Sequence, residues 1–168
     1  MRESLFSKEY AVYWPDQYEP LVNFLKKAPI GQDSGKSGFF DNNMEVIAFA
    51  ASYGFLKRCS LPPGNCTKEI STSIFENNGY GSFLYLIPLM DCEGPPDLYL
   101  LRDSDGEQRC LKIFESYVAG GLQLLSEEWT KAATKSAYMF VDDILLGTRA
   151  GNTPRLNSDV VGGIDDIF

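Results

Sequence analysis

The sequence predicts a small, single-domain, mainly α protein with no more than one or two short strands. Apolar residues recur at helical spacing in several segments, of which the longest runs from residue 107 to residue 133. Strict alternation of apolar and polar residues is confined to short stretches, so an extended sheet is not expected. A length of 168 residues suits one domain with an appended tail. We therefore expect a globular helical domain over residues 1–147 and a flexible acidic-hydrophobic tail over residues 148–168.

The first predicted helix follows Pro15 and ends before Pro29. Asp16 stands at the N-cap position with Glu19 three residues later, which is the spacing of a capping box. Pro20 falls in the first turn, where a missing N–H group is tolerated. One apolar stripe runs along this helix, formed by Tyr18, Leu21, Val22 and Leu25.

The second predicted helix begins at a cap formed by Asp41 or Asn42. It ends at Gly54, which can adopt the left-handed conformation of a C-terminal cap. Its apolar positions at helical spacing are Met44, Ile47, Ala48, Ala51 and Phe55. The stretch ISTSIF at residues 70–75 alternates over too few residues to predict a strand.

The apolar run at residues 82–90 is compatible with either a buried helix or a strand, because periodicity does not separate the two in a short run. Pro88 lies inside it and is unsuited to a central strand, so we predict a helix that kinks or ends there. The following LYLL sequence at residues 98–101 is expected to be extended within a connecting loop.

The longest helical pattern, at residues 107–133, contains the pair Gly120-Gly121 in its middle. Each interior glycine weakens a helix by about 1 kcal/mol relative to alanine. The pair therefore predicts either a bend or the close approach of another backbone. A last amphipathic helix is predicted over residues 136–147.

Composition excludes several classes of function. The chain contains no histidine, which removes Ser-His-Asp and Cys-His catalysis and histidine-dependent metalloenzymes. The net charge of −8 repels nucleic acid and anionic membranes, so direct nucleic-acid binding is disfavoured. No apolar segment is long enough to span a bilayer, and the N-terminus has no signal-peptide pattern. These features predict a cytoplasmic protein without a membrane partner.

No metal or cofactor is expected. The four cysteines have no zinc-site spacing and are predicted to be free thiols. Gly35-Lys36-Ser37 resembles the end of a phosphate-binding loop, but Gly31 is one residue too close for that motif, and a linker is the preferred interpretation. The segment Asp103–Gly106 lacks the later ligands of a calcium loop and is expected to be a turn before a helix.

The remaining carboxylates show no catalytic pattern. Asp142 and Asp143 are adjacent on a predicted helix and therefore point about 100° apart, which is unsuited to sharing a proton or a metal. Glu127-Glu128 has the same spacing. Glu115 is expected to form an ordinary surface ion pair with Lys112.

Three stretches of the chain carry a family resemblance, namely FFDNNMEVIAFAASYGFLKR, ISTSIFENNGY and KIFESYVAGGLQLL. Taken in this order, they resemble the DNA phosphorothioation (dnd) system-associated protein 4 family of bacteria. Val118-Ala119 stands where that family usually has Ala-Asn, which removes a side-chain amide. The resemblance covers roughly residues 16–130 in separate pieces. It implies an accessory protein encoded beside bacterial phage-defence systems and supplies no catalytic residues.

The expected function is a non-catalytic accessory or adaptor subunit of a bacterial anti-phage defence complex, acting through protein contacts. Its partner would be a larger subunit such as an ATPase or a nuclease. One alternative is a magnesium-dependent, carboxylate-based nuclease or nucleotide-processing enzyme, because ligands from different elements can converge in space. A second alternative is a DNA-sensing module that uses the helix at residues 42–53 with Lys57 and Arg58.

The candidate partner-binding residues lie in the C-terminal sequence GGIDDIF. It resembles the acidic-hydrophobic tip of bacterial single-stranded-DNA-binding proteins, without their penultimate proline. Apolar side chains could enter a pocket of a partner while the carboxylates meet a basic rim. The alternatives are that the tail folds back on the core or has no role. The proposed contact residues are Ile164, Asp165, Asp166, Ile167 and Phe168.

Overall fold

The computed structural model confirms a mainly α fold and describes residues 6–27, 38–92, 94–132 and 136–151. The elements, in chain order, are β1 (Ala11–Trp14), η1 (Asp16–Tyr18), α1 (Glu19–Leu25), α2 (Asn43–Leu56), β2 (Lys68–Ser71), α3 (Thr72–Asn77), α4 (Phe83–Met90), η2 (Leu98–Leu101), α5 (Ser104–Lys131) and α6 (Ala137–Gly151). The two strands pair antiparallel, with Val12 opposite Ile70. In these ranges, no helix combines the length and the apolar character needed to cross a bilayer.

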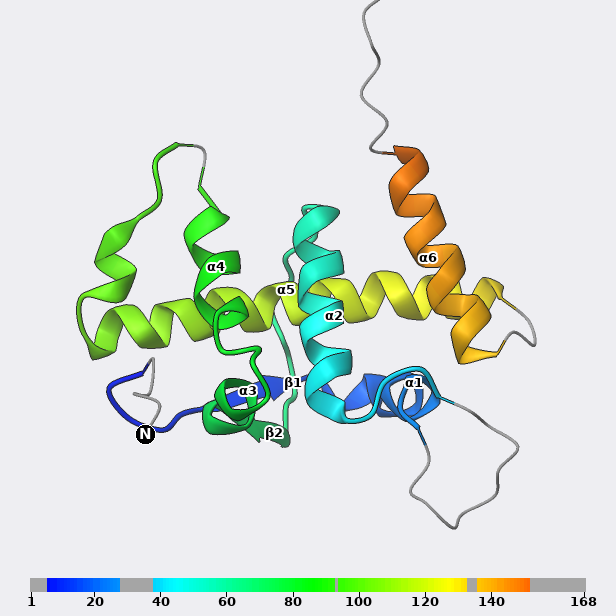
Figure 1. Cartoon of the computed structure of the whole chain (residues 1–168), viewed down its shortest axis with the longest axis horizontal. Helices are drawn as coiled ribbons and strands as arrows, with labels where there is room; N and C mark the ends of the chain where they lie inside the picture. The colour runs from blue at the N-terminus through cyan, green and yellow to red at the C-terminus, as the bar shows by residue number, and fades with distance from the viewer. Residues whose placement is uncertain (1–5, 28–37, 93, 133–135, 152–168) are drawn as a thin grey trace, which may run out of the picture.

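The long helix α5 is the central element, and α2, α4, η2 and β1 pack directly against it (Figure 1). Helix α2 crosses its middle, α4 and η2 lie at its N-terminal end, and α6 lies at its C-terminal end. The two strands, α1 and α3 lie together along the other side of α5. The outer surface of the molecule is therefore formed by α4 and η2 at one end of α5 and by α6 at the other end.

Helices α2 and α5 touch through their backbones where they cross. A Cβ atom added at Gly121 would overlap the Ala50 carbonyl oxygen, and one added at Gly120 would overlap the Cys59 carbonyl oxygen. A Cβ atom at Gly54 would overlap the Tyr117 carbonyl oxygen. Of the two roles expected for Gly120-Gly121, the structure therefore shows close backbone approach.

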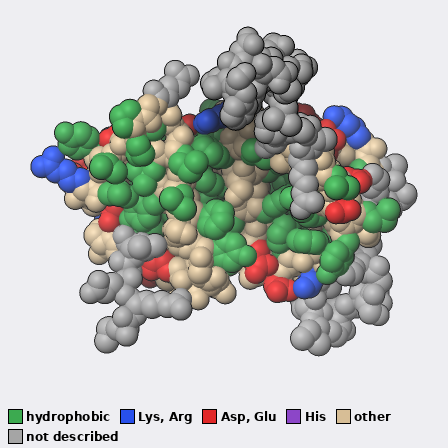
Figure 2. Space-filling model, turned by 45° about the horizontal axis from the view of Figure 1, so that its top comes forward, with side chains coloured by type: hydrophobic (Ala, Val, Ile, Leu, Met, Phe, Trp, Pro, Cys, Tyr) green, Lys and Arg blue, Asp and Glu red, His purple; other side chains and the backbone are tan. Residues whose placement is uncertain are grey.

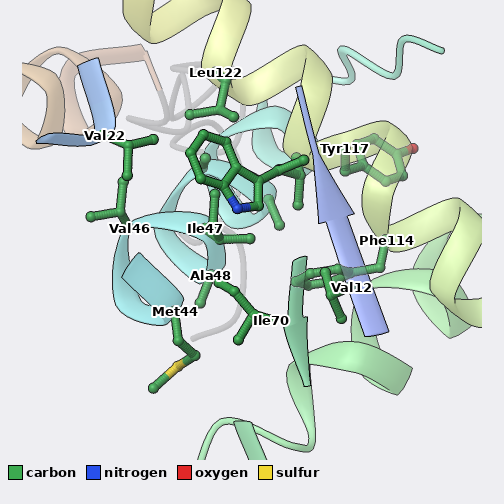
Figure 3. Packing of buried hydrophobic residues seen from close by; sticks show 14 of the residues in the cluster. Val12, Val22, Met44, Val46, Ile47, Ala48, Ile70, Phe114, Tyr117 and Leu122 are labelled. Atoms are coloured by element: carbon green, nitrogen blue, oxygen red, sulfur yellow. The ribbon is translucent and has the colours of Figure 1, made fainter. Parts of the chain in front are cut away.

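The hydrophobic core lies around this crossing. Figure 3 shows Val12 and Ile70 from the strands, Ile47 from α2, and Phe114 and Leu122 from α5 in the cluster. All five side chains are buried. Because strands and helices contribute to one cluster, the described residues share one continuous core.

The predicted capping box at Asp16 is wrong, because the Asp16 carboxylate accepts hydrogen bonds from residues at the start of β2 instead. It accepts hydrogen bonds from the Thr67 N–H at 2.8 Å, the Thr67 hydroxyl at 2.9 Å and the Lys68 N–H at 3.2 Å. Residues 16–18 form a 3₁₀ turn, and α1 begins only at Glu19. Pro20 lies in the first turn of α1, as predicted.

The prediction for the start of α2 is confirmed, whereas that for its end is wrong. The Asn42 side chain accepts a hydrogen bond from the Glu45 N–H at 3.0 Å, and the Glu45 carboxylate accepts one from the Asp41 N–H at 2.8 Å. Gly54 lies inside α2 rather than at its cap. The left-handed residue that follows the helix is Arg58, with φ of 54°.

Three other boundaries differ from the predictions because tertiary contacts decide them. The stretch 70–75 is divided between the end of β2 and the start of α3. Residues 98–101 form the 3₁₀ helix η2 and not an extended segment. Helix α6 runs past Gly147 to Gly151, so residues 148–151 are helical; the rest of the predicted tail lies outside the described residues.

Replacing Gly121 with alanine should destabilise the protein, because the new Cβ would push against a backbone oxygen that cannot move without separating α2 from α5. We expect the free energy of unfolding to fall by at least about 2 kcal/mol in urea denaturation followed by circular dichroism. Gly147→Ala is the matched control, since nothing lies within 4 Å of its added Cβ. It should be neutral or stabilising by up to about 1 kcal/mol. Equal losses for the two variants would contradict the proposed crossing.

Candidate functional site

The structure does not test the predicted tail contact, because Ile164–Phe168 lies outside the described residues. The same is true of Gly35-Lys36-Ser37. Asp103 is the N-cap of α5, and its carboxylate accepts a hydrogen bond from the Gly106 N–H at 2.9 Å. The segment Asp103–Gly106 is therefore not a calcium loop but the first turn of α5, which begins three residues earlier than the predicted start at residue 107.

The structure does not bring the described carboxylates together into a metal site. Within the described ranges, no group of three or more cysteine, aspartate or glutamate side chains is placed to hold a metal ion. Asp142 and Asp143 are exposed on α6, and Glu128 forms an ion pair with Lys131 at 2.9 Å. The four cysteines are free thiols.

Glu115 was expected to form a surface ion pair, and this prediction is wrong. Its carboxylate instead accepts a hydrogen bond from the Tyr13 N–H at 2.8 Å, which ties β1 to α5. Burial raises the pKa of Glu115. The residue therefore stabilises the attachment of the small sheet to the long helix.

Glu107 is a buried carboxylate that the sequence analysis missed. Its side chain is only 8% exposed and accepts hydrogen bonds from the Ser7 N–H at 2.7 Å, the Ser7 hydroxyl at 2.6 Å and the Tyr10 hydroxyl at 2.8 Å. Burial alone would raise the pKa of Glu107, but these hydrogen bonds, with the charge of Lys8, hold it below its ordinary value. Glu107 thereby anchors the segment before β1 to α5.

Exposed apolar side chains lie on α4 and on η2, at one end of the molecule. These residues, here called the α4–η2 surface, are Leu86, Met90, Leu98, Tyr99 and Leu101. Leu98 is 66% exposed and Tyr99 is 69% exposed. Figure 2 shows hydrophobic side chains gathered over this end of the molecule. Exposed apolar residues that form a group, unlike scattered ones, typically mark an interaction site.

Local structure explains why α4 exposes apolar side chains. Leu84, Ile87 and Pro88 face the protein interior, whereas Leu86 and Met90, four residues apart, face outward. The helix is thus apolar on more than one face. A helix of this kind needs a second covering surface. This signal was present in the sequence FLYLIPLM and could have identified the site.

The short helix η2 exposes its apolar residues because four residues can turn only one side chain inward. That residue is Leu100, which is buried against α5. Asp97 begins the turn by accepting a hydrogen bond from the Tyr99 N–H at 3.1 Å, and its carboxylate also pairs with Arg109 of α5 at 3.5 Å. A shallow hollow of about 630 Å³ lies along residues 96–102.

Tyr117 of α5 holds the C-terminal end of α4. Its hydroxyl donates a hydrogen bond to the carboxylate of Asp91, the residue that follows α4. Burial, together with this bond, raises the pKa of Tyr117 to about 12, so the hydroxyl stays protonated at neutral pH. The α4–η2 surface is therefore fixed to α5 through Tyr117 as well as through Arg109.

A groove of about 880 Å³ lies on the other side of the molecule, between β2 and the start of α2. The β2 side of the groove is formed by Glu69, Ile70 and Ser71, with Ile74 from α3. The opposite side is formed by Lys26, Lys27 and residues 41–44. Lys27 pairs with Asp41 at 2.7 Å, so these two charges neutralise each other.

Helix α6 carries a smaller apolar feature. Its residues Tyr138, Met139, Leu145 and Leu146 are exposed. With Phe39, whose ring lies 5.1 Å from that of Tyr138, α6 lines a hollow of about 310 Å³. This hollow is smaller than the other two.

Comparison with known proteins confirms the family resemblance. Residues 13–156 match the family model described as DNA sulphur modification system-associated protein 4. No curated protein and no solved structure matches this chain.

Glu107→Gln should destabilise the protein at neutral pH and change how its stability depends on pH. Since the folded-state pKa of Glu107 is below the ordinary value of 4.5, the carboxylate stabilises the fold above that pH. This contribution is lost as the pH falls from 4.5 through the lower folded-state pKa. The glutamine variant should lose less stability than the parent protein over that interval, measured by urea denaturation from pH 7 to pH 3. Parallel pH profiles for the two proteins would contradict the assignment.

Proposed function

We propose that this chain, which belongs to the DNA sulphur modification system-associated protein 4 family, is a non-catalytic accessory subunit that binds another protein of a bacterial defence system. The family name places the chain with the DNA sulphur modification system. The adaptor role is our inference from the surface of the molecule. The observation that carries it is the α4–η2 surface, where large apolar side chains are exposed together.

Burial of this surface would favour association with a protein. Each square ångström of apolar surface removed from water contributes about 25 cal/mol before the costs of association. Tyr99 and Met90 belong to residue types that are enriched in protein interfaces. The 3₁₀ turn and the contacts of α4 and η2 with α5 hold the backbone in place, so little backbone freedom remains to be lost on binding.

The charges beside the α4–η2 surface indicate the character of the partner. Among the described residues there, four carboxylates outnumber three cations. The carboxylates are Asp91, Asp97, Asp103 and Asp105, and the cations are Arg102, Arg109 and Arg58, the last of which lies beside Tyr117. The surroundings of the apolar surface are therefore acidic. A partner with an apolar centre and a basic rim would be complementary and would associate faster at low salt.

The alternatives from the sequence make different experimental predictions. Magnesium-dependent turnover of DNA or nucleotide, abolished by one carboxylate-to-amide change, would support an enzyme. Salt-sensitive duplex binding that depends on Lys57 and Arg58 would support a DNA-sensing module. Neither result is expected for an adaptor that acts through apolar contacts.

Leu98→Ser combined with Tyr99→Ser should weaken binding to the partner protein by at least about tenfold, because interface energy concentrates in a few large side chains. Each protein of the sulphur modification system would be expressed singly and titrated by isothermal calorimetry. Met139→Ser with Leu146→Ser is the matched control, since these residues are also exposed but lie on α6. If the chain binds no protein of the system, alone or coexpressed with all of them, the adaptor role is wrong.

The acidic-hydrophobic segment Ile164–Phe168 is proposed as a second contact with the partner. Deleting residues 162–168 should leave the melting temperature nearly unchanged and weaken partner binding, more strongly at low salt than at high salt. Differential scanning calorimetry and the same titrations would measure both effects. A fall of several degrees in the melting temperature would instead assign this segment to the core of the protein.

A further inference from the structure

The two edges of the small sheet have different surroundings. In an antiparallel pair, residues alternate between those that bond to the partner strand and those whose backbone groups point away from it. The Thr72 N–H donates to the Tyr10 carbonyl oxygen at 2.8 Å, which fixes this alternation. By the observed register, Tyr13 and Glu69 form a pair whose N–H and C=O groups point away from the other strand.

The outer edge of β1 is covered by α5, which confirms this assignment. The Tyr13 N–H points away from β2 and donates to the Glu115 carboxylate of α5. The corresponding groups of Glu69 point the opposite way, and Glu69 lines the 880 Å³ groove. The edge of β2 therefore presents an N–H donor and a C=O acceptor to the groove. Open strand edges of this kind bind extended chains.

We propose that this groove binds an extended peptide segment of a protein partner, which pairs with the edge of β2 at Glu69. The segment would carry apolar side chains alternating with acidic ones. This site is separate from the α4–η2 surface and does not depend on the function proposed for that surface. A volume of about 880 Å³ is within the range of sites that hold ligands of several residues or of drug size.

The lining of the groove determines the chemistry of the peptide. Ile74 is 44% exposed and offers an apolar contact on the β2 side. On the opposite side, Lys27 is neutralised by Asp41, whereas Lys26 forms no ion pair with any described residue. Lys26 is therefore the cation available to an acidic side chain of the peptide. Side chains of an extended chain alternate in direction. A peptide can therefore place apolar side chains against Ile74 and acidic side chains toward Lys26 at the same time.

The test uses the full chain and a blocked synthetic peptide of alternating valine and aspartate residues, Ac-Val-Asp-Val-Asp-Val-NH₂. Two-dimensional NMR titration should show saturable shifts of the backbone amides of Glu69 and Ser71. Lys26→Glu should weaken binding at least about fivefold, as charge complementarity requires. Lys57→Glu carries the same change of charge at the far end of α2 and should leave binding unchanged. The peptide with lysines in place of aspartates should bind no more than weakly.

The role of the strand edge is tested separately from that of the side chain. Glu69→Pro removes the outward N–H without removing a hydrogen bond between β1 and β2, and it should weaken binding about tenfold. Glu69→Ala keeps the N–H and removes one negative charge from the groove, so it should bind the acidic peptide at least as tightly as the parent protein. Methylating the central amide nitrogen of the peptide removes a peptide donor instead, and it should also weaken binding while the protein is unchanged. Absence of saturable binding, or shifts that map to η2 or α6 instead, would overturn the proposal, as would occupation of the groove by a second copy or by a segment of this chain.

Discussion

The arrangement of the molecule depends on one backbone contact, where α2 crosses α5. Gly54, Gly120 and Gly121 leave the space that the carbonyl groups of the opposite helix or loop occupy. Side chains at these positions would hold the helices apart and open gaps among the core residues. The weak helix propensity of three glycines is therefore offset by close packing at the centre of the protein.

This crossing also determines where surfaces for partners can form. Helix α5 has 28 residues and is about 42 Å long, so α2 covers only its middle. Its N-terminal end is left for α4 and η2, which are too short to bury all their apolar side chains. The sheet has only two short strands. Helix α5 covers its β1 edge, and no described residue bonds to the backbone of Glu69 at the β2 edge. Both candidate binding features thus follow from a long helix with short partners.

The electrostatics of the chain are consistent with a protein that binds other proteins. A net charge of −8 opposes direct contact with DNA, although the family is associated with a DNA modification system. An acidic protein can contribute to such a system by binding a partner whose basic residues also bind DNA. The acidic residues around η2 would favour a basic partner. Lys26, in the groove beside β2, would favour an acidic one.

The sequence by itself determined the helical class, the start of α2 and the family, because these depend on periodicity, a local cap and motifs. It also indicated that Gly120-Gly121 had a structural role, without showing which backbone approaches. Only the tertiary structure decided that Asp16 serves β2, that Glu107 anchors the N-terminal segment, and that one strand edge remains open. These features join residues about 50 to 100 positions apart, and a local pattern contains no information about which distant groups become neighbours when the core packs.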